Sequence, residues 1–224
     1  MGAPKLVVFD VDGTLVDSQA LIVEAQRRAF TACGLAVPAR ERSLSIVGLS
    51  LREAFTVLVG PEGPVGQLVE AYKAAFGELR SDRRWEEPLF PGMAEVIADL
   101  SGRDDVLLGI ATGKSMRGVA HLIEREGWSL IFSTIQTADD APSKPHPAML
   151  HQALSETGAE AEHAVMLGDT TFDMEMARAA GVRPIGVTWG YHAPALLRAA
   201  GADVLVSSTD ELRPLIGLTP AVMA

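Results

Sequence analysis

Two aspartates stand two residues apart, directly after a short apolar run near the start of the chain. Asp10 and Asp12 follow Leu6–Phe9, whose side chains predict a buried strand, and Gly13 then allows a sharp turn. Side chains at positions i and i+2 of a strand point to the same side, so both carboxylates can face one site. Carboxylates held close together repel each other and need a cation or a shared proton. The pair therefore indicates a metal site or an acid–base site.

A second acidic pair stands in the stretch GDTTFD, which follows the apolar run Ala164–Leu167 and contains Asp169 and Asp173. Hard oxygen ligands suit Mg²⁺, which keeps several waters and binds one or two carboxylates together with substrate oxygens. The sequence has no matching cluster of histidines or cysteines, so a zinc site is not expected. We expect Mg²⁺ to be the cofactor.

The stretch ATGKS holds Thr112, Gly113 and Lys114 at the end of another apolar run. It is not a P-loop, because the first glycine of that pattern would have to be residue 108, which is Leu108. A threonine hydroxyl and the backbone N–H groups at a helix start suit a phosphate group. We expect Thr112 and Gly113 to bind phosphate and Lys114 to be a solvent-facing helix residue.

Lys144 lies in a segment that three prolines, Pro142, Pro145 and Pro147, make rigid. A stiff loop can aim one ammonium group at an anionic centre. Its neighbour His146 stands near a helix start and is expected to be a structural or surface residue.

Short apolar runs alternate with helical patterns over most of the chain, which predicts a Rossmann-like α/β fold with a parallel sheet covered on both faces. The expected strands are Leu6–Phe9, Val106–Ala111, Ile131–Ile135, Ala164–Leu167, Pro184–Thr188 and Val204–Val206. The expected helices of this part are Gly92–Leu100, Ser115–Glu126, Pro147–Thr157, Phe172–Ala180 and Ala193–Ala199. In such sheets ligands bind beyond the carboxyl ends of the strands, where three of the four motifs fall; the Lys144 segment comes just before the fourth strand.

One segment breaks this alternation. Between about residues 17 and 87 there is no strand pattern, but Ala20–Ala32, Leu51–Leu58 and Gln67–Leu79 have helical patterns. Pro88 and Pro91 then mark the return to the sheet. We expect residues 1–16 and 89–224 to form the α/β core and residues 17–88 to form a small inserted helical domain.

The composition narrows the classes of function. The chain has 224 residues with 19 basic and 29 acidic side chains, and its net charge of −10 argues against nucleic acid or an anionic membrane as a partner. No apolar run reaches the roughly 18 residues of a membrane helix, and the first residues have no signal-peptide pattern. We expect a cytoplasmic protein that acts on a small molecule.

The four motifs resemble those of the haloacid dehalogenase superfamily, in the branch that inserts a helical cap after the first motif, as phosphoglycolate phosphatases do. DVDGTLVDS is similar to the nucleophile motif, ATGKS to the Thr/Ser motif, KPHP to the lysine motif and GDTTFDM to the acidic motif. The resemblance covers almost the whole chain. It implies a Mg²⁺-dependent phosphatase, and it makes residues 17–88 the cap domain.

The resemblance also implies roles for the first two motifs. Asp10 would be the nucleophile and a metal ligand. Asp12 would be the general acid and base, with its backbone carbonyl on the metal. Thr112 and the Gly113 N–H would bind the phosphoryl oxygens.

The remaining roles fall on the later motifs. Lys144 would bridge Asp10 and the phosphate. Asp169 would bind Mg²⁺, and Asp173 would act in the outer shell of the metal or hold Lys144.

Other reactions of the superfamily fit less well. Dehalogenases lack an acid at the place of Asp12, and the stretch SQALIVEAQRRAF lacks the cap lysine of phosphonate-cleaving relatives. Sugar-phosphate mutases carry a histidine in the early cap, where this chain has Ser18, Gln19 and Ala20. A mutase, a nucleotidase and a pyrophosphatase stay open as alternatives, whereas a purely binding role would leave a complete set of catalytic positions unused.

The cap is expected to select the substrate through the loop Ile46–Leu51, in which Gly48 is a candidate substrate-binding residue. Ser45 and Ser50 flank the tip, and Arg52 lies just beyond. These groups suit a small phosphorylated metabolite such as phosphoglycolate. The sequence leaves open whether the protein is a monomer or a homodimer.

Overall fold

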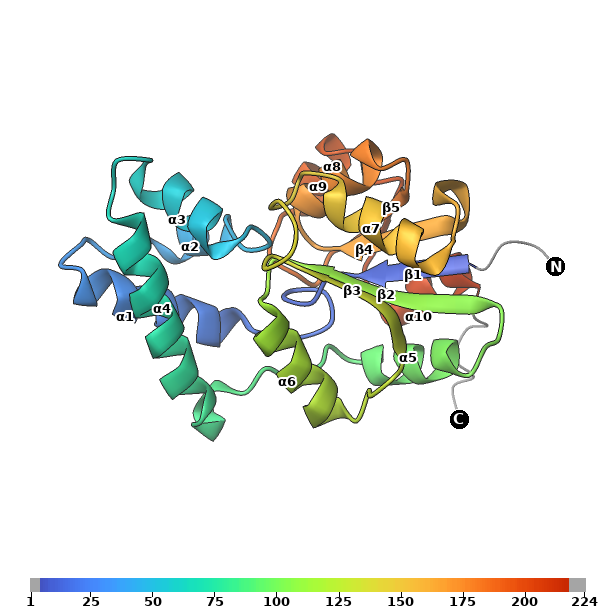
Figure 1. Ribbon diagram of the computed structural model, residues 1–224, viewed down its shortest axis with the longest axis horizontal. Coiled ribbons are helices and arrows are strands. Elements are labelled where there is room, and N and C mark those ends of the chain that lie inside the picture. Colours follow the sequence, from blue (N-terminus) through green and yellow to red (C-terminus); the bar gives the residue numbers. More distant parts are fainter. Residues whose placement is uncertain (1–4, 218–224) are drawn as a thin grey trace.

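The protein has a six-stranded parallel sheet with helices on both faces (Figure 1). A computed structural model describes residues 5–217. The strands, in the order β3-β2-β1-β4-β5-β6, are β1 (Lys5–Phe9), β2 (Val106–Thr112), β3 (Phe132–Thr137), β4 (Ala164–Gly168), β5 (Arg183–Val187) and β6 (Val204–Val206). The expected α/β fold and all six expected strands are confirmed.

Alternating side chains of the central strand build the two layers of the core. Val7 and Phe9 of β1 pack on one face of the sheet, whereas Leu6 and Val8 pack on the other, and all four are fully buried. A strand that is buried on both faces needs an unbroken apolar run, and this is the pattern that predicted β1.

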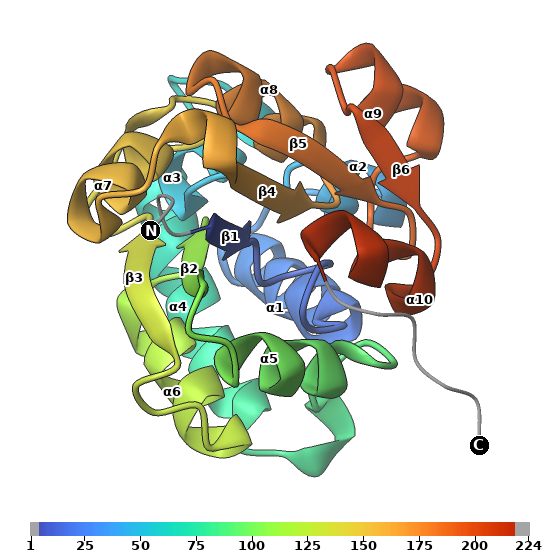
Figure 2. The same cartoon turned by 90° about the vertical axis from the view of Figure 1, so that its right-hand side faces the viewer.

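Helices cover each face of the sheet (Figure 2). One layer contains α5 (Met93–Ser101), α6 (Met116–Glu126), α10 (Thr209–Leu212) and η3 (Arg213–Ile216). The other contains α7 (Ala148–Thr157), η2 (Ala161–His163), α8 (Thr171–Ala179) and α9 (Pro194–Ala199). None of the described helices is long and apolar enough to cross a membrane.

The strand order reverses next to β1. This strand pairs with β2 on one side and with β4 on the other, so the chain winds outward in both directions from it. Loops that leave neighbouring strands at such a switch point diverge and open a crevice at the carboxyl edge of the sheet. The fold therefore brings the residues after β1, β2 and β4 to one place.

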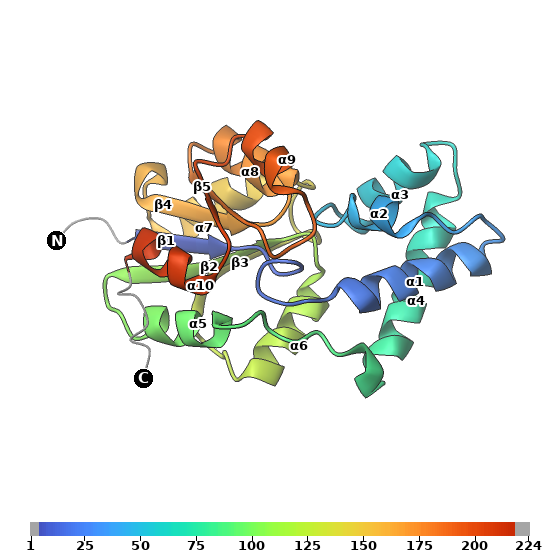
Figure 3. The same ribbon diagram turned by 180° about the vertical axis from the view of Figure 1, so that it is seen from behind.

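Residues between β1 and α5 form a separate group of helices beyond the carboxyl edge of the sheet (Figures 1 and 3). The group comprises α1 (Gln19–Ala32), α2 (Arg40–Leu44), α3 (Leu51–Val59), α4 (Val65–Arg80) and η1 (Arg83–Trp85). The expected helices are present as α1, α3 and α4. The short α2 was not predicted, because five residues are too few to show helical periodicity.

The helical group has its own apolar core, in which Phe55 of α3 contacts two aromatic rings. Its ring centroid lies 6.1 Å from that of Phe30 and 5.7 Å from that of Tyr72. Because these side chains come from α1, α3 and α4, they hold three helices together.

The segments that enter and leave the helical group run side by side. Asp17 N donates to Pro88 O at 2.8 Å, and Phe90 N donates to Leu15 O at 2.9 Å. Val16 and Leu89 form an antiparallel bridge between these two bonds. A short two-stranded connection therefore joins the helical group to the sheet.

We expect Phe55→Ala to lower the free energy of unfolding by about 3–5 kcal/mol, because it leaves a cavity among three helices. Val57→Ala is the matched control. Val57 lies on the same helix with 46% of its surface exposed, so its removal is expected to change stability by less than about 0.5 kcal/mol. Urea unfolding monitored by circular dichroism measures both values, and equal effects would contradict a core at Phe55.

Candidate active site

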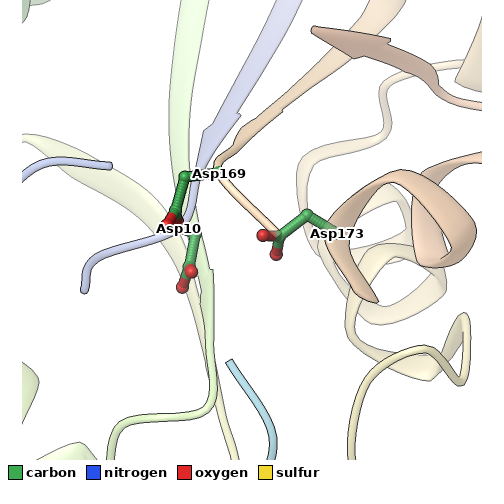
Figure 4. Close-up of side chains that lie close together, drawn as sticks. All are labelled: Asp10, Asp169 and Asp173. Carbon is green, nitrogen blue, oxygen red and sulfur yellow. The ribbon is translucent and has the colours of Figure 1, made fainter. Parts of the chain in front are cut away.

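Three buried aspartates converge at the carboxyl edge of the sheet (Figure 4). Asp10 follows β1, and its backbone N–H donates to Leu167 O of β4 at 2.9 Å. Asp169 follows β4, and Asp173 lies in the first turn of α8. One carboxylate oxygen of each residue lies within 4.8 Å of the others. The structure therefore brings together three aspartates that the sequence analysis identified separately.

Lys144 is the cation of this cluster, and its side chain is completely buried. Its Nζ lies 2.9 Å from Asp10 Oδ1 and 2.6 Å from Asp173 Oδ1. Burial alone would lower the pKa of the ammonium, but the two carboxylates outweigh that effect and raise the pKa to about 12. Lys144 therefore stays charged and points at the anionic centre.

Both carboxylate oxygens of Asp173 accept hydrogen bonds from neighbouring groups. Oδ1 accepts from Lys144, and Oδ2 accepts from Thr170 N at 3.1 Å and from Thr170 Oγ1 at 2.7 Å. Thr170 caps α8 in return, so the pair forms a capping box at the N-terminus of that helix. This geometry fits a residue that holds Lys144 better than one that contacts a metal directly.

Asp169 is held in a tight backbone cradle. Its Oδ1 accepts from Thr14 Oγ1 at 3.1 Å, and its Oδ2 accepts from Tyr191 N at 2.8 Å. A Cβ added to Gly13 or to Gly190 would lie 2.2 Å from an atom of Asp169, so only glycine fits on either side. The carboxylate is therefore fixed, and each of its oxygens accepts one hydrogen bond.

The cluster is short of positive charge. Burial raises the pKa of Asp10 from 3.8 to about 7, although Lys144 opposes the shift and Asp173 adds to it. Burial also raises the pKa of Asp169 well above its usual value, with Asp173 and Asp10 adding to the effect. Within residues 5–217 neither oxygen of Asp10 has an assigned hydrogen-bond partner, and Lys144 Nζ lies 2.9 Å from Oδ1 as an ion pair. These oxygen donors suit a hard divalent cation.

The phosphate-binding candidates lie beside the cluster. Thr112 ends β2 and is buried, and its Oγ1 accepts from Lys114 N at 3.2 Å. A Cβ added to Gly113 would lie 2.5 Å from Gly48 O and 2.7 Å from Leu49 O. The loop between α2 and α3 therefore rests directly on Gly113.

The same loop contacts two further motifs. A Cβ added to Gly48, whose φ is +99°, would lie 3.1 Å from Thr170 Oγ1. Ser50 N donates to Ser143 Oγ at 2.9 Å, next to the buried lysine. The structure thus places the expected substrate loop against three of the four motifs, and the contact of Gly48 with a substrate stays a prediction.

The expectation that Lys114 faces solvent is wrong. Its side chain is only 9% exposed, and its Nζ lies 2.8 Å from both Asp12 Oδ1 and Glu87 Oε1. The helix begins only at Met116, after the N-cap Ser115. Lys114 therefore belongs to the turn after β2, which directs it inward, and not to the surface of the helix.

The carboxylate of Asp12 lies outside the three-aspartate cluster and pairs with Lys114 instead. The resemblance implied that Asp12 binds a metal through its backbone carbonyl, so this position of the side chain is compatible with that role. His146 is exposed, in agreement with the expectation.

Sequence reasoning missed Tyr191 and Glu87. Besides its N–H on Asp169, Tyr191 places its hydroxyl 3.1 Å from Ser18 N and 3.0 Å from Ser18 Oγ. It thereby links the site to the start of α1. No motif marks Tyr191, and only the position of Glu87 just before the return to the sheet could have drawn attention to it.

Comparisons with known proteins agree with this geometry. The family model described as haloacid dehalogenase-like hydrolase matches residues 7–187. The chain is 38% identical to a probable phosphatase, IndB, of Dickeya dadantii, with 92% of this chain and 91% of the relative covered. It is 29% identical to a phosphoglycolate phosphatase of Salmonella typhi, with 95% and 92% covered. A solved haloacid dehalogenase-like hydrolase of Streptococcus pneumoniae superposes with a TM-score of 0.81 at 26% identity, covering 96% of this chain and 99% of that one.

We expect Asp169→Asn to change the free energy of unfolding of the metal-free protein, relative to the wild type, more favourably at about pH 8 than at about pH 5. The comparison is between the two pH values, because Asn cannot accept both hydrogen bonds that Thr14 and Tyr191 donate to the carboxylate. The raised pKa means that the folded state of the wild type binds more protons than the unfolded state. The contribution of Asp169 to the stability of the wild type is therefore fully present at low pH, and it is lost as the pH rises through the pKa that Asp169 has in the folded state. Urea unfolding in the presence of a chelator measures the difference between variant and wild type.

The control is Asp104→Asn, because Asp104 lies exposed in the turn before β2. Its difference from the wild type, measured at the same two pH values, is the baseline for an exposed carboxylate. An Asp169→Asn difference that changes no more between these pH values than that of Asp104→Asn would contradict the proton uptake described for the buried cluster.

Proposed function

Because the chain belongs to the haloacid dehalogenase-like hydrolase family, we propose that it is a phosphatase that hydrolyses a small phosphate monoester. The observation that carries the proposal is a buried Asp10 that pairs with Lys144 while its carboxylate receives no hydrogen bond within the described residues. A second carboxylate, Asp12, stands two residues away. This arrangement supplies a nucleophile, a neutralising cation and a proton donor.

The reaction proceeds in two steps on two carboxylates. An oxygen of Asp10 attacks phosphorus, the P–O bond to the leaving group breaks, and Asp12 gives its proton to the departing alkoxide. Asp12 then takes a proton from a water molecule, whose oxygen attacks the aspartyl phosphate. Inorganic phosphate leaves, and both aspartates return to their starting states.

Charge neutralisation makes this attack feasible, because a carboxylate and a phosphate dianion repel each other. Lys144, already beside Asp10, neutralises part of the charge. Thr112 Oγ1 and the Gly113 N–H bind the phosphoryl oxygens at the end of β2. Asp173 keeps Lys144 in place through its ion pair.

The residues present fit Mg²⁺ as the cofactor. The donors are all oxygens, and both oxygens of Asp10 lack hydrogen bonds within the described part of the chain. Asp10, Asp169 and the backbone carbonyl of Asp12 would hold the ion, with Asp173 in its outer shell. When bound, Mg²⁺ supplies a Lewis acid that neutralises the charge of the phosphoryl oxygens.

Residues 17–88 act as a cap that limits the size of the substrate. The loop with Gly48 lies against Gly113 and Thr170, and thus beside the phosphate-binding candidates and the acidic motif. A small ester such as phosphoglycolate fits this arrangement, and the similarity to a phosphoglycolate phosphatase supports it. Ranking phosphate esters by kcat/KM identifies the preferred substrate, and formation of an isomer without free phosphate would indicate a mutase instead.

We expect exhaustive EDTA treatment to abolish turnover and added Mg²⁺ to restore it, because the aspartate cluster lacks positive charge. Ca²⁺ is expected to inhibit, since its larger and looser coordination misplaces Asp10. Phosphate release from p-nitrophenyl phosphate measures both effects. Full activity of a verified metal-free preparation would rule out the proposed cofactor.

We expect the two aspartates of the first motif to differ in their effects on p-nitrophenyl phosphate. Asp10→Asn removes the nucleophile and should abolish turnover. Asp12→Asn keeps the first step, because p-nitrophenolate needs little protonation to leave, but it slows hydrolysis of the aspartyl phosphate by about 10²–10⁴-fold. A burst of p-nitrophenol equal to the enzyme concentration follows.

Mass spectrometry of the acid-quenched Asp12→Asn variant then locates the phosphate on the peptide that contains Asp10. With an alkyl phosphate the same variant should give no burst, because an alkoxide must be protonated to leave. Absence of the phosphopeptide, together with appreciable activity of Asp10→Asn, would refute the covalent mechanism.

A further inference from the structure

Lys114 makes ion pairs with Asp12 and Glu87, and the proposed reaction gives these pairs no role. We propose that Lys114 positions Asp12: it holds one oxygen of the carboxylate and leaves the other for proton transfer to the leaving group. Glu87 in turn holds Lys114. The inference rests on the proposed function, in which Asp12 is the general acid.

The geometry supports a fixed arrangement. Lys114 Nζ donates to Asp12 Oδ1 and to Glu87 Oε1, both at 2.8 Å. The three side chains are only 9%, 13% and 6% exposed, so water competes little for these bonds. Charge-assisted hydrogen bonds in a dry environment are short and strong, and they restrict the rotation of the carboxylate. Lys114 contacts Oδ1, and Oδ2 is the oxygen that would carry the proton.

The packing around the lysine stem shows that this position is built into the fold. A Cβ added to Gly118 of α6 would lie 2.8 Å from Lys114 Cγ, so the helix leaves space for the stem only because residue 118 is glycine. On the other side the ring of Phe76 from α4 lies 5.3 Å from Nζ, which adds a cation–π contact. A solvated surface lysine would need neither feature.

Each aspartate of the first motif thus has its own lysine. Lys144 pairs with Asp10 and reaches it from the loop before α7, whereas Lys114 pairs with Asp12 and reaches it from the turn after β2. Because the two lysines come from different segments, each can hold its own carboxylate independently of the other. A misplacement of about 1 Å costs a catalytic group about 10²-fold in rate.

Lys114 could instead bind an anionic group of the substrate directly. The position of Glu87 argues against this alternative, since its carboxylate already occupies a donor of the ammonium and would repel a second anion. The two roles differ in what they predict for substrates. Positioning of the acid depends on the leaving group, whereas direct binding depends on the charge of the substrate.

The test compares three phosphate esters by kcat/KM, which reports the step in which the leaving group departs. The esters are p-nitrophenyl phosphate, butyl phosphate and 2-phosphoglycolate. For Lys114→Met we expect kcat/KM to fall about 10–100-fold more with the two alkyl esters than with p-nitrophenyl phosphate. The fall should be similar for butyl phosphate and for 2-phosphoglycolate, although only the latter carries a carboxylate. Asp12→Asn is the reference and should show the same pattern more strongly.

Two further variants change the arrangement without removing the charge. Gly118→Ala should push the lysine stem aside, because its Cβ would lie 2.8 Å from Lys114 Cγ, and should reproduce the pattern more weakly. Lys114→Arg keeps the charge and should recover part of the loss on alkyl esters. Lys73→Met is the control, since Lys73 lies on the exposed face of α4 and should leave all three values unchanged.

Two results would contradict the role of Lys114 and leave the proposed phosphatase function intact. If Asp12→Asn shows the leaving-group pattern but Lys114→Met loses equally on all three esters, Lys114 does not position the acid. If Lys114→Met loses only on 2-phosphoglycolate, it binds the substrate carboxylate. If Asp12→Asn itself shows no pattern, the assignment of the general acid fails, and the positioning role fails with it.

Discussion

The buried ion pairs of Lys144 are the interaction on which the rest of the site depends. Its Nζ joins Asp10 after β1 to Asp173 at the start of α8, so one ammonium ties together three separate segments of the core. Removing one partner of a buried pair typically costs about 3–5 kcal/mol, because the other charge is left uncompensated. The same pairs place a cation 2.9 Å from Asp10. Under the proposed mechanism, the group that stabilises the site therefore also neutralises its nucleophile.

Contacts from the helical group complete the site from the opposite side. The carbonyls of Gly48 and Leu49 lie on Gly113, and Tyr191 joins the backbone around Asp169 to Ser18 at the start of α1. Tyr191 also packs against a small apolar cluster of Ile22, Leu44 and Val47 in the helical group. The large apolar cores of the sheet and of the helical group stay separate, which suits the proposed cap.

The sequence predicted what depends on local pattern. The apolar runs predicted β1 and β4, because strands that are buried on both faces consist of apolar residues. The turns that follow these strands carry Asp10 and Asp169 in recognisable motifs. It could not predict the partner of Lys114, because Glu87 stands 27 residues away and reaches it only when the chain has returned from the helical group. The contact of Tyr191 with Ser18 spans 173 residues and depends on how the whole chain folds. Side chains whose role comes from a distant partner leave no periodic or motif signal.

The paired segments at residues 15–17 and 88–90 have an evolutionary consequence. Because the chain leaves and re-enters the sheet at neighbouring points, the two ends of the core are already joined across the gap by backbone hydrogen bonds. A different insertion between these points would leave the strand order and the four motifs intact. Selection can therefore replace the part of the gene that encodes the helical group while the part that encodes the sheet is inherited unchanged.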